Sequence, residues 1–289
     1  MKDGVLVVIA KSGVMRVLVV LAGVVFAASV GFAEPIIDVA AQAEWSAGSP
    51  LPVPEPTGGT YRVLWDTSHG VYPGYEPAGN YAALVSHLGG DGFAVDTTSA
   101  GFLVDDPAGY DVLVVCTLSA YDSQYTPAEV SRITTFVADG GGLLILSENT
   151  DCPNPNVQPL ASPFGVSLGL SYITERDIYT SDLASHPIFD GVSQIYMRAA
   201  GEISAVAPST ELAWEEVTGQ ALGAAATYGS GRVVTLGDSN LWGRTEYYDL
   251  ADNRQFSVST FNWLAVPEPG TLALLCGTAA LVLLKRRRS

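Results

Sequence analysis

Apolar and polar residues follow one another along the middle of the chain in a pattern that predicts strands and helices in turn. Residues 61–66, 93–97 and 111–116 form short apolar runs typical of buried strands, and residues 80–88 have helical spacing. Strands separated by helical segments indicate a mostly parallel sheet with helices on both faces. The run at 111–116 is the most apolar of the body, so we expect it at the centre of the sheet.

The clearest local signal predicts a helix that starts after Thr126. A threonine followed by Pro127 and then by Glu129 has the pattern of a capping box with proline at the first helical position. Positions 130, 133, 134 and 137 fall on one face of this helix, and glycines at 140–142 end it before a strand at 143–146.

Later in the chain, the pattern adds an antiparallel hairpin and a last helix. Residues 221–227 and 232–236 flank the turn sequence Tyr-Gly-Ser-Gly at 228–231. Asp252 and Gln255 repeat the capping-box pattern and open a helix that runs through Leu264. We therefore expect a single α/β domain over residues 61–265.

The beginning of the chain reads as an export signal over residues 1–33. Positive charge up to Arg16 precedes an apolar run at 17–28, and the small residues Gly31 and Ala33 suit cleavage by a signal peptidase. Met15 is an alternative start, because a chain that began there would still carry a complete signal. An uncleaved anchor helix is the alternative interpretation. Residues 34–60, rich in Ala, Pro, Ser and Gly, read as a linker.

The end of the chain, residues 266–289, combines a proline motif, a short apolar helix and a basic cluster. The apolar stretch 271–284 spans about 21 Å as a helix, which is marginal for crossing a bilayer. The cluster that would stay on the cytoplasmic side consists of Lys285, Arg286, Arg287 and Arg288. A second Val-Pro-Glu-Pro at 53–56 has no apolar helix after it and reads as linker.

The order of these three features resembles the PEP-CTERM sorting signal of exosortase substrates, with Pro267, Glu268 and Pro269 matching the motif. The resemblance implies a sorting transpeptidase as partner at the membrane. It also implies an exported protein, transiently anchored in the inner membrane and then held at the cell surface or released. A plain membrane anchor is the alternative.

Charge is distributed unevenly and limits the partners. Between Glu34 and Val266 there are 7 Arg, no Lys and 28 Asp plus Glu, which gives a net charge of −21. Such a surface repels phosphate backbones, so nucleic acid is excluded as a partner class.

Four stretches of the body resemble the glutamine-amidotransferase-like domains of the GIFT and DUF4350 type. They are YRVLWDTSHGVYPG from Tyr61, ADGGGLLIL from Ala138, GSGRVVTLGDSN from Gly229, and residues 252–264. The likeness extends to the domain that follows the catalytic unit of site-one subtilisin-like proteases. It implies a flavodoxin-like sheet and a binding or accessory role.

The residues that amide hydrolysis requires are not in their expected pattern. Related amidotransferases place the nucleophile in a Gly-x-Cys-x-Gly turn, whereas no glycine flanks Cys152 and Pro153 follows it. A pair of Cys152 with His186 is the remaining catalytic alternative. Cys116 and Cys152 are also candidates for a disulfide, because each lies at or after the end of a neighbouring strand.

Polar side chains at the carboxyl ends of the strands are the candidate ligand-binding residues. In open parallel sheets ligands bind beyond these ends. The candidates are Asp66, Ser68, His69, Glu148, Asp151, Asp238, Ser239 and Asn240. Asp238 and Asn240 have capping of a turn as their alternative role. These residues have neither the EF-hand nor the nonapeptide spacing of calcium sites, so we predict no metal and no cofactor.

Aromatic residues near the same ends are candidates for stacking on sugar rings: Trp65, Tyr72, Tyr75, Trp242, Tyr247 and Tyr248. Core packing is the alternative role of Trp65. The sequence thus favours an exported, surface-anchored module that binds a saccharide or an envelope protein without catalysis. The alternatives are a Cys-dependent hydrolase and an accessory subunit of an exported protease.

Overall fold

The computed structural model describes residues 6–11, 14–21, 24–29, 60–70, 72, 74–116, 124–149, 152, 154–173 and 177–266. By its contacts the chain divides into two units, Met1–Leu51 and Pro52–Ser289. In the first unit, β1 (Leu6–Lys11), β2 (Val14–Leu21) and β3 (Val24–Ser29) form an antiparallel three-stranded sheet. The structure therefore has strands where an anchor helix was the alternative expectation, and the export signal stays a prediction.

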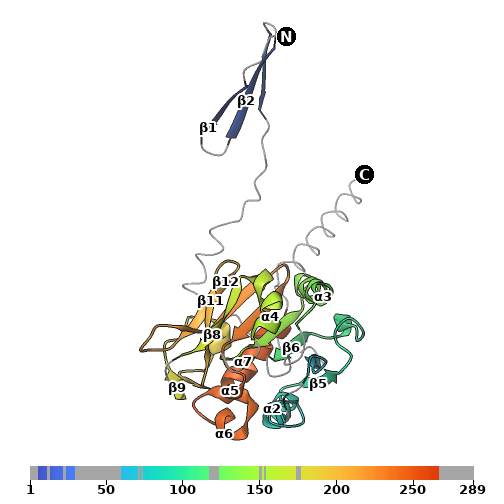
Figure 1. Cartoon of the computed structure of the whole chain (residues 1–289), viewed down its shortest axis with the longest axis vertical. Helices are drawn as coiled ribbons and strands as arrows, with labels where there is room; N and C mark the ends of the chain where they lie inside the picture. The colour runs from blue at the N-terminus through green and yellow to red at the C-terminus, as the bar shows by residue number, and fades with distance from the viewer. Residues whose placement is uncertain are drawn as a thin grey trace, which may run out of the picture. The chain divides into compact units, whose positions relative to one another are not determined.

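The second unit is built on one large sheet (Figure 1). In the described part of the chain this sheet has nine strands in the order β5-β4-β6-β7-β14-β13-β11-β8, with β12 also paired to β13. The strands are β4 (Tyr61–Asp66), β5 (Phe93–Thr98), β6 (Val112–Cys116), β7 (Gly142–Leu146), β8 (Val166–Tyr172), β11 (Gly201–Ala205), β12 (Ser209–Trp214), β13 (Ala221–Tyr228) and β14 (Gly231–Leu236).

The half of the sheet from β5 to β14 is parallel and confirms the predicted fold class. β4 pairs in parallel with β5 and β6, and β7 pairs in parallel with β6 and β14. β6 lies between β4 and β7, at the centre of this half, as its apolar sequence predicts. Cys116 pairs with Leu146, which pairs with Leu236, so the carboxyl ends of three strands are level at one edge.

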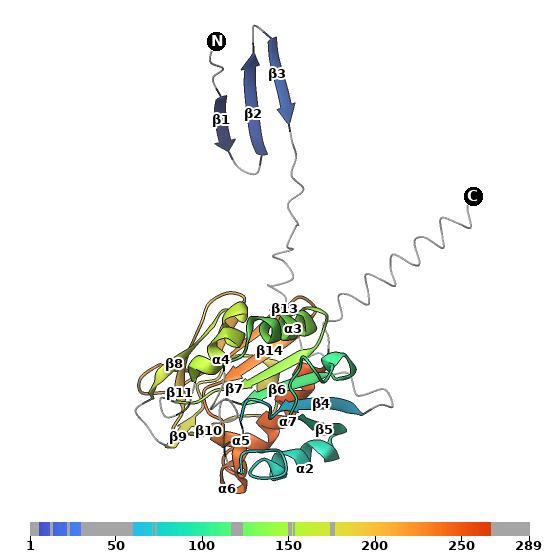
Figure 2. The same cartoon turned by 45° about the vertical axis from the view of Figure 1, so that its right-hand side comes forward.

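Helices cover both faces, as Figure 2 shows. One face carries α2 (Ala82–Gly90), α5 (Asn240–Gly243), α6 (Thr245–Tyr248) and α7 (Asn253–Ala265), and the other carries α3 (Pro127–Ala138) and α4 (Asn154–Ala161). Short 3-10 turns η2 (Pro107–Gly109), η4 (Ser162–Phe164) and η5 (Pro187–Phe189) connect elements.

Strand β6 shows why its sequence is apolar throughout. Val112, Val114 and Cys116 belong to the core under α2 and α7, whereas Leu113 and Val115 belong to the core under α3 and α4. Because successive side chains point to opposite faces, a strand covered on both sides has no polar alternation.

The two predicted capping boxes have different outcomes. At α3 the box is confirmed: Glu129 N donates to Thr126 Oγ1 at 3.3 Å and Thr126 N donates to Glu129 Oε2 at 2.7 Å. At α7 it is wrong, because the Asp252 side chain makes no cap bond. Its carboxylate instead accepts hydrogen bonds from Ser193 N and Oγ, at 2.8 and 2.7 Å, so it ties the helix start to a distant loop.

The antiparallel part is larger than the predicted hairpin. The hairpin itself, β13 with β14, is present and turns through Gly229, whose φ is +60°. Strands β8, β11 and β12 extend it, and β9 (Asp177–Thr180) pairs with β10 (Ile195–Arg198) in a separate small sheet. β9, β10 and β11 are only four or five residues long, too short for periodicity to indicate them, whereas β8 (VSLGLSY) does alternate apolar and polar residues and was missed.

Within the described ranges, no helix combines the length and the apolar character that spanning a bilayer requires. The proposed sorting motif Pro267 to Pro269, the apolar stretch after it and the basic cluster lie outside the described residues.

Candidate functional site

The polar residues predicted at the carboxyl ends of the strands do come together at one edge of the sheet. Asp66 is the last residue of β4, Glu148 follows β7 by two residues, and Asp238 follows β14 by two residues. All three side chains are buried. They belong to two hydrogen-bonded clusters, which we name after Asp66 and Glu148.

The Asp66 cluster consists of Asp66, Ser68, His69, Tyr125 and Glu129. Ser68 N and Oγ donate to Asp66 Oδ1 at 2.9 and 2.7 Å, and Tyr125 Oη donates to Asp66 Oδ2. His69 is held by carboxylates at both ring nitrogens: Nδ1 lies 2.9 Å from Asp66 Oδ2 and Nε2 lies 3.3 Å from Glu129 Oε1. The Tyr125 ring stacks on His69 with centroids 3.9 Å apart.

These contacts decide the charges of the cluster. Burial by itself raises the pKa of Asp66, but hydrogen bonds from His69, Tyr125 and Ser68 outweigh it and leave the pKa below its usual value. Burial likewise lowers the pKa of His69, and the carboxylates of Asp66 and Glu129 outweigh it and raise the pKa. The carboxyl groups of Asp66 and Glu129, one at each ring nitrogen, therefore favour the protonated form of His69.

The Glu148 cluster consists of Glu148, Asn149, Asp238, Ser239 and Asn240. Glu148 Oε1 accepts hydrogen bonds from Ser239 N at 3.1 Å, Ser239 Oγ at 2.6 Å and Asn240 Nδ2 at 2.8 Å. Oε2 accepts from Asn149 N at 3.3 Å and from Asn149 Nδ2 at 2.9 Å. Five donors of the chain itself thus surround one carboxylate that is 1% exposed.

Asp238 acts as a turn residue. Its Oδ1 accepts a hydrogen bond from Asn240 N at 2.6 Å and its Oδ2 accepts one from Arg198 N at 2.5 Å. Burial, and then the nearby charge of Glu148, raise the pKa of Asp238 well above its usual value. Of the two roles considered for Asp238, capping of backbone groups is the one found.

The catalytic alternative fails on geometry. Cys152 follows β7 beyond the carboxyl edge of the sheet, whereas the His186 ring packs on Trp263 at 4.7 Å. The Trp263 carbonyl accepts a hydrogen bond from Arg232, which pairs with Gly142 at the opposite, amino edge. Cys152 and His186 therefore do not meet.

Cys116 and Cys152, the two cysteines of the described body, are not joined to each other in the structure, so the disulfide considered for this pair is not formed. Cys116 is buried at the end of β6, and its Sγ lies 3.4 Å from Tyr81 Oη. Cys152 is partly exposed. Asp151 lies outside the described residues.

The predicted aromatic set divides into core and surface. Trp65, Trp242 and Tyr248 are at most 1% exposed and belong to the core. For Trp65 this is the alternative role considered above, and the stacking on sugars predicted for Trp242 and Tyr248 is wrong. Tyr72 is 46% exposed, and its ring meets that of Tyr75 edge-on with centroids 5.7 Å apart.

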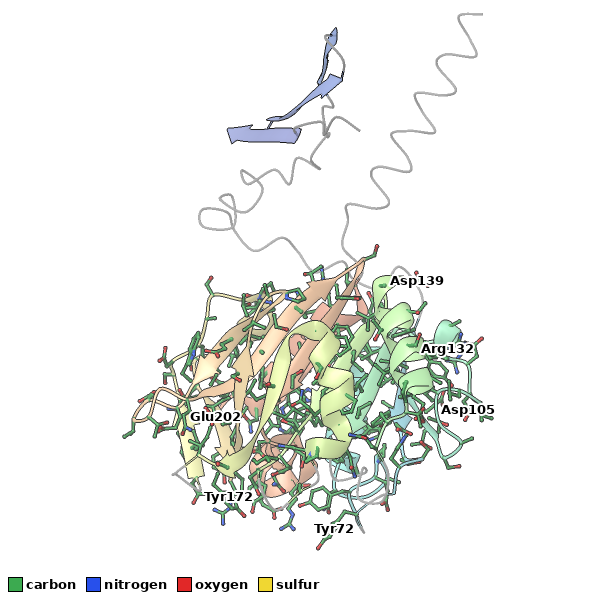
Figure 3. The ribbon with its side chains drawn as sticks, turned by 45° about the horizontal axis from the view of Figure 1, so that its top comes forward. Tyr72, Asp105, Arg132, Asp139, Tyr172 and Glu202 are labelled. Carbon is green, nitrogen blue, oxygen red and sulfur yellow. The ribbon has the colours of Figure 1, made fainter. Side chains whose placement is uncertain are left out.

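Above the Glu148 cluster lies a surface that we call the tyrosine–arginine rim, formed by Tyr72, Tyr75, Arg244 and Tyr247. The Arg244 guanidinium carbon is 6.0 Å from the ring centroids of both Tyr75 and Tyr247. Tyr75 Oη donates to Asn240 Oδ1 at 2.8 Å, which joins the rim to the buried cluster. Figure 3 shows Tyr72 and Tyr172 projecting from the same lower edge, with Asp139 at the upper edge.

Sequence reasoning missed Tyr125, Asn149 and Arg244. Tyr125 and Asp66 are 59 positions apart, and no local pattern connects them. Arg244 stands between two four-residue helices that have no amphipathic period. Only Asn149, next to Glu148, had a local signal as one more polar residue after β7.

A separate cavity of about 310 Å³ lies at the amino edge of the sheet, with Tyr110, Arg132, Phe136, Asp139 and Ala265 in its wall. It shares no residue with either cluster. Among the described side chains, no group of three or more His, Cys, Asp or Glu is arranged to hold a metal ion.

Comparison with known proteins relates the chain to one family and to several solved structures. A family described as "Domain of unknown function (DUF4350)" matches residues 77–275. The chain is similar in structure to the mmIFT52 N-terminal domain, with a TM-score of 0.60 and 14% identity over 71% of this chain and 97% of that domain.

Two cytoplasmic proteins of Salmonella typhimurium are also similar in structure, each with a TM-score of 0.53. STM1381 from strain LT2 is 18% identical over 70% of this chain and 99% of its own. STM3548 is 16% identical over 72% and 99%. At such identities the likeness concerns the fold alone. No curated protein sequence matches the chain.

Proposed function

The chain belongs to the DUF4350 family, and from that premise we propose that its body is a non-catalytic module that binds a saccharide at the carboxyl edge of the sheet. The observation that carries the proposal is the saturation of Glu148. A carboxylate that acts as a general base or a nucleophile has to contact the substrate. Both oxygens of Glu148 are instead occupied by hydrogen bonds from five donors of the same chain.

The separation of Cys152 from His186 supports the same proposal, because a thiol nucleophile needs a base within hydrogen-bonding reach. In this proposal the body shares the architecture of amidotransferase-like domains and lacks their nucleophile turn. We propose further that the protein is exported and that its tail is a sorting signal, on the strength of the residue pattern at 266–289.

The proposed ligand surface is the tyrosine–arginine rim. Tyrosine rings present flat apolar faces with a polar tip, which suits the faces of sugar rings. The buried clusters beneath hold the loops that carry the rim, so they fix its shape without touching the ligand.

The test uses the purified full-length protein in detergent. We expect no glutaminase or ester hydrolase turnover, and equal results for the wild type and Cys152→Ala. We also expect a rise in melting temperature with soluble sugars, because a ligand that binds only the native state stabilises it. Turnover that Cys152→Ala abolishes would overturn the proposal and establish a thiol hydrolase.

A further inference from the structure

The arginines of the described body differ in how well their charges are neutralised. Arg62 lies 2.8 Å from Asp96 and Arg254 lies 2.6 Å from Asp249. Arg132 pairs with Asp106 and Arg198 with Asp177, both at short range. Arg232 is buried and donates to the Trp263 carbonyl at 2.7 Å.

Arg244 is the exception among these. The nearest carboxylate oxygen paired with it is Glu246 Oε1 at 3.8 Å, and its side chain is 45% exposed. An ion pair this long and this exposed contributes little. In a body with a net charge of −21, a weakly paired arginine at the edge predicted to bind ligand marks a place where one negative group is favoured.

The position of Arg244 is fixed by its neighbours. The residue is extended, between the end of α5 and the start of α6. Its guanidinium lies near the rings of Tyr75 and Tyr247, 6.0 Å from each, and Tyr75 is anchored through Asn240 to the buried Glu148. Tyr75 also touches the exposed ring of Tyr72, so Tyr72 and Arg244 are both neighbours of one buried tyrosine.

We propose that the rim binds a saccharide that carries a single carboxylate, that is, a uronic acid unit, with the sugar ring on Tyr72 and the carboxylate on Arg244. This inference rests on the proposed function and deepens it. The guanidinium fork matches a carboxylate in a bidentate pair, which Lys or a neutral side chain does not reproduce. One negative group is the limit, because the net charge of the body repels a polyanion.

The experiment compares glucuronate, its neutral isostere glucuronamide and glucose as probes of the full-length protein in detergent, by ligand-observed NMR titration. We expect glucuronate to bind at least about 10-fold more tightly than glucuronamide, the effect of one charge-assisted pair. Arg244→Gln should remove this preference, so that the variant binds glucuronate no more tightly than glucuronamide. Tyr72→Ala should weaken both ligands.

Arg254→Gln is the matched control, because Arg254 also lies over a tyrosine, 5.5 Å from the Tyr248 ring centroid, but is closely paired with Asp249. It should bind all probes as the wild type does. Thermal denaturation of every variant verifies that each is folded.

Three results would overturn the inference. Equal affinity for glucuronate and glucuronamide would remove the role of Arg244 while the binding function stands. Displacement of glucuronate by equimolar inorganic phosphate would show a general anion site. Absence of binding by any of the sugars to the folded wild type would overturn both the inference and the proposed function.

Discussion

Two histidines of this chain, His69 and His186, show how residues of one type acquire different pKa values from their surroundings. His69 lies between the carboxylates of Asp66 and Glu129, which raise its pKa. His186 lies against Trp263, and burial together with the nearby Arg232 lowers its pKa to about 4. The sequence places both histidines next to turns and does not distinguish them.

We predict that His186 makes the protein less stable in acid. The unfolded side chain takes up a proton as the pH falls below 6.5, whereas the folded one stays neutral until about pH 4. Stability should therefore be lost between these pH values, with uptake of about one proton on unfolding near pH 5.

His186→Asn tests this prediction, because asparagine does not titrate and still accepts the cap hydrogen bond that Ile188 N donates to His186 Nδ1. Urea denaturation at pH 7 and pH 5 should show a smaller difference in unfolding free energy for the variant than for the wild type. An unchanged difference would mean that His186 is protonated in the folded protein.

The two buried aspartates show the same principle with opposite outcomes. Hydrogen bonds with His69, Tyr125 and Ser68 lower the pKa of Asp66 in spite of burial. Burial, and then the nearby Glu148, raise the pKa of Asp238 well above its usual value, and its backbone donors do not offset this rise. A carboxylate at the end of a strand is therefore not by itself a ligand residue.

At the scale of elements, the start of α3 connects local helix chemistry to the site. Glu129 Oε2 completes the capping box with Thr126, and Glu129 Oε1 contacts His69. One side chain thus stabilises the helix and the Asp66 cluster together. The sequence pattern indicated the first role but not the second.

We predict that Thr126→Ala and Glu129→Ala separate these roles. Thr126→Ala should cost about 1 kcal/mol of unfolding free energy, the usual effect of a lost cap. Glu129→Ala should cost more and should also lower the pKa of His69, because a neighbouring negative charge is removed. The measurements are urea denaturation and NMR titration of the His69 ring. An equal His69 pKa in both variants would contradict the shared role of Glu129.

Gly201 lies beside the Glu148 cluster, at a point where two backbone segments approach each other too closely for a side chain. A Cβ at Gly201 would lie 2.3 Å from the carbonyl oxygen of Glu148 and 3.1 Å from Asn149 Cα. Gly201 N also donates to the carbonyl of Gly237 at 2.7 Å, so the strand cannot move away without breaking this hydrogen bond.

We predict that Gly201→Ala lowers the unfolding free energy by about 2 kcal/mol or more, because the packed backbone has no room for a methyl group. Gly89→Ala in α2 is the matched control, since nothing lies within 4 Å of its Cβ position. That variant should gain about 0.5 kcal/mol from reduced entropy of the unfolded chain. Urea denaturation measures the unfolding free energy of both variants. A Gly201→Ala variant as stable as the wild type would contradict the close approach.

At the scale of the whole molecule, the large sheet of the second unit carries different features at its two edges. The carboxyl edge carries the buried clusters and the rim, whereas the amino edge carries the cavity near Ala265, the residue before the end of the described chain. Substitutions in the rim should thus leave the amino edge unaffected, because no residue belongs to both.

We predict that the protein recovered from its host's envelope lacks residues 1–33 and the residues after Pro269. An export signal is removed during transport, and a sorting transpeptidase would cleave at the proline motif. Intact mass spectrometry measures both ends at once. A product found in the cytosol with both ends intact would contradict export and sorting together.

Local pattern was enough to predict much of the parallel half of the fold. A strand covered on both faces is apolar throughout, and a capped helix has polar residues at fixed offsets, so β4, β6 and α3 are encoded in contiguous residues. The convergence of Asp66, Glu148 and Asp238 at one edge was also predictable, because parallel strands end on the same side.

Only the tertiary structure decided which of these side chains remain accessible. Burial of Glu148 depends on Ser239 and Asn240, more than 90 positions away, and the clamp on His69 depends on Tyr125 and Glu129 from another element. The distance from Cys152 to His186 and the weak pairing of Arg244 are likewise set by packing. The exposure and the pKa of a side chain depend on all of its neighbours in space. The order of residues along the chain does not state which residues those neighbours are.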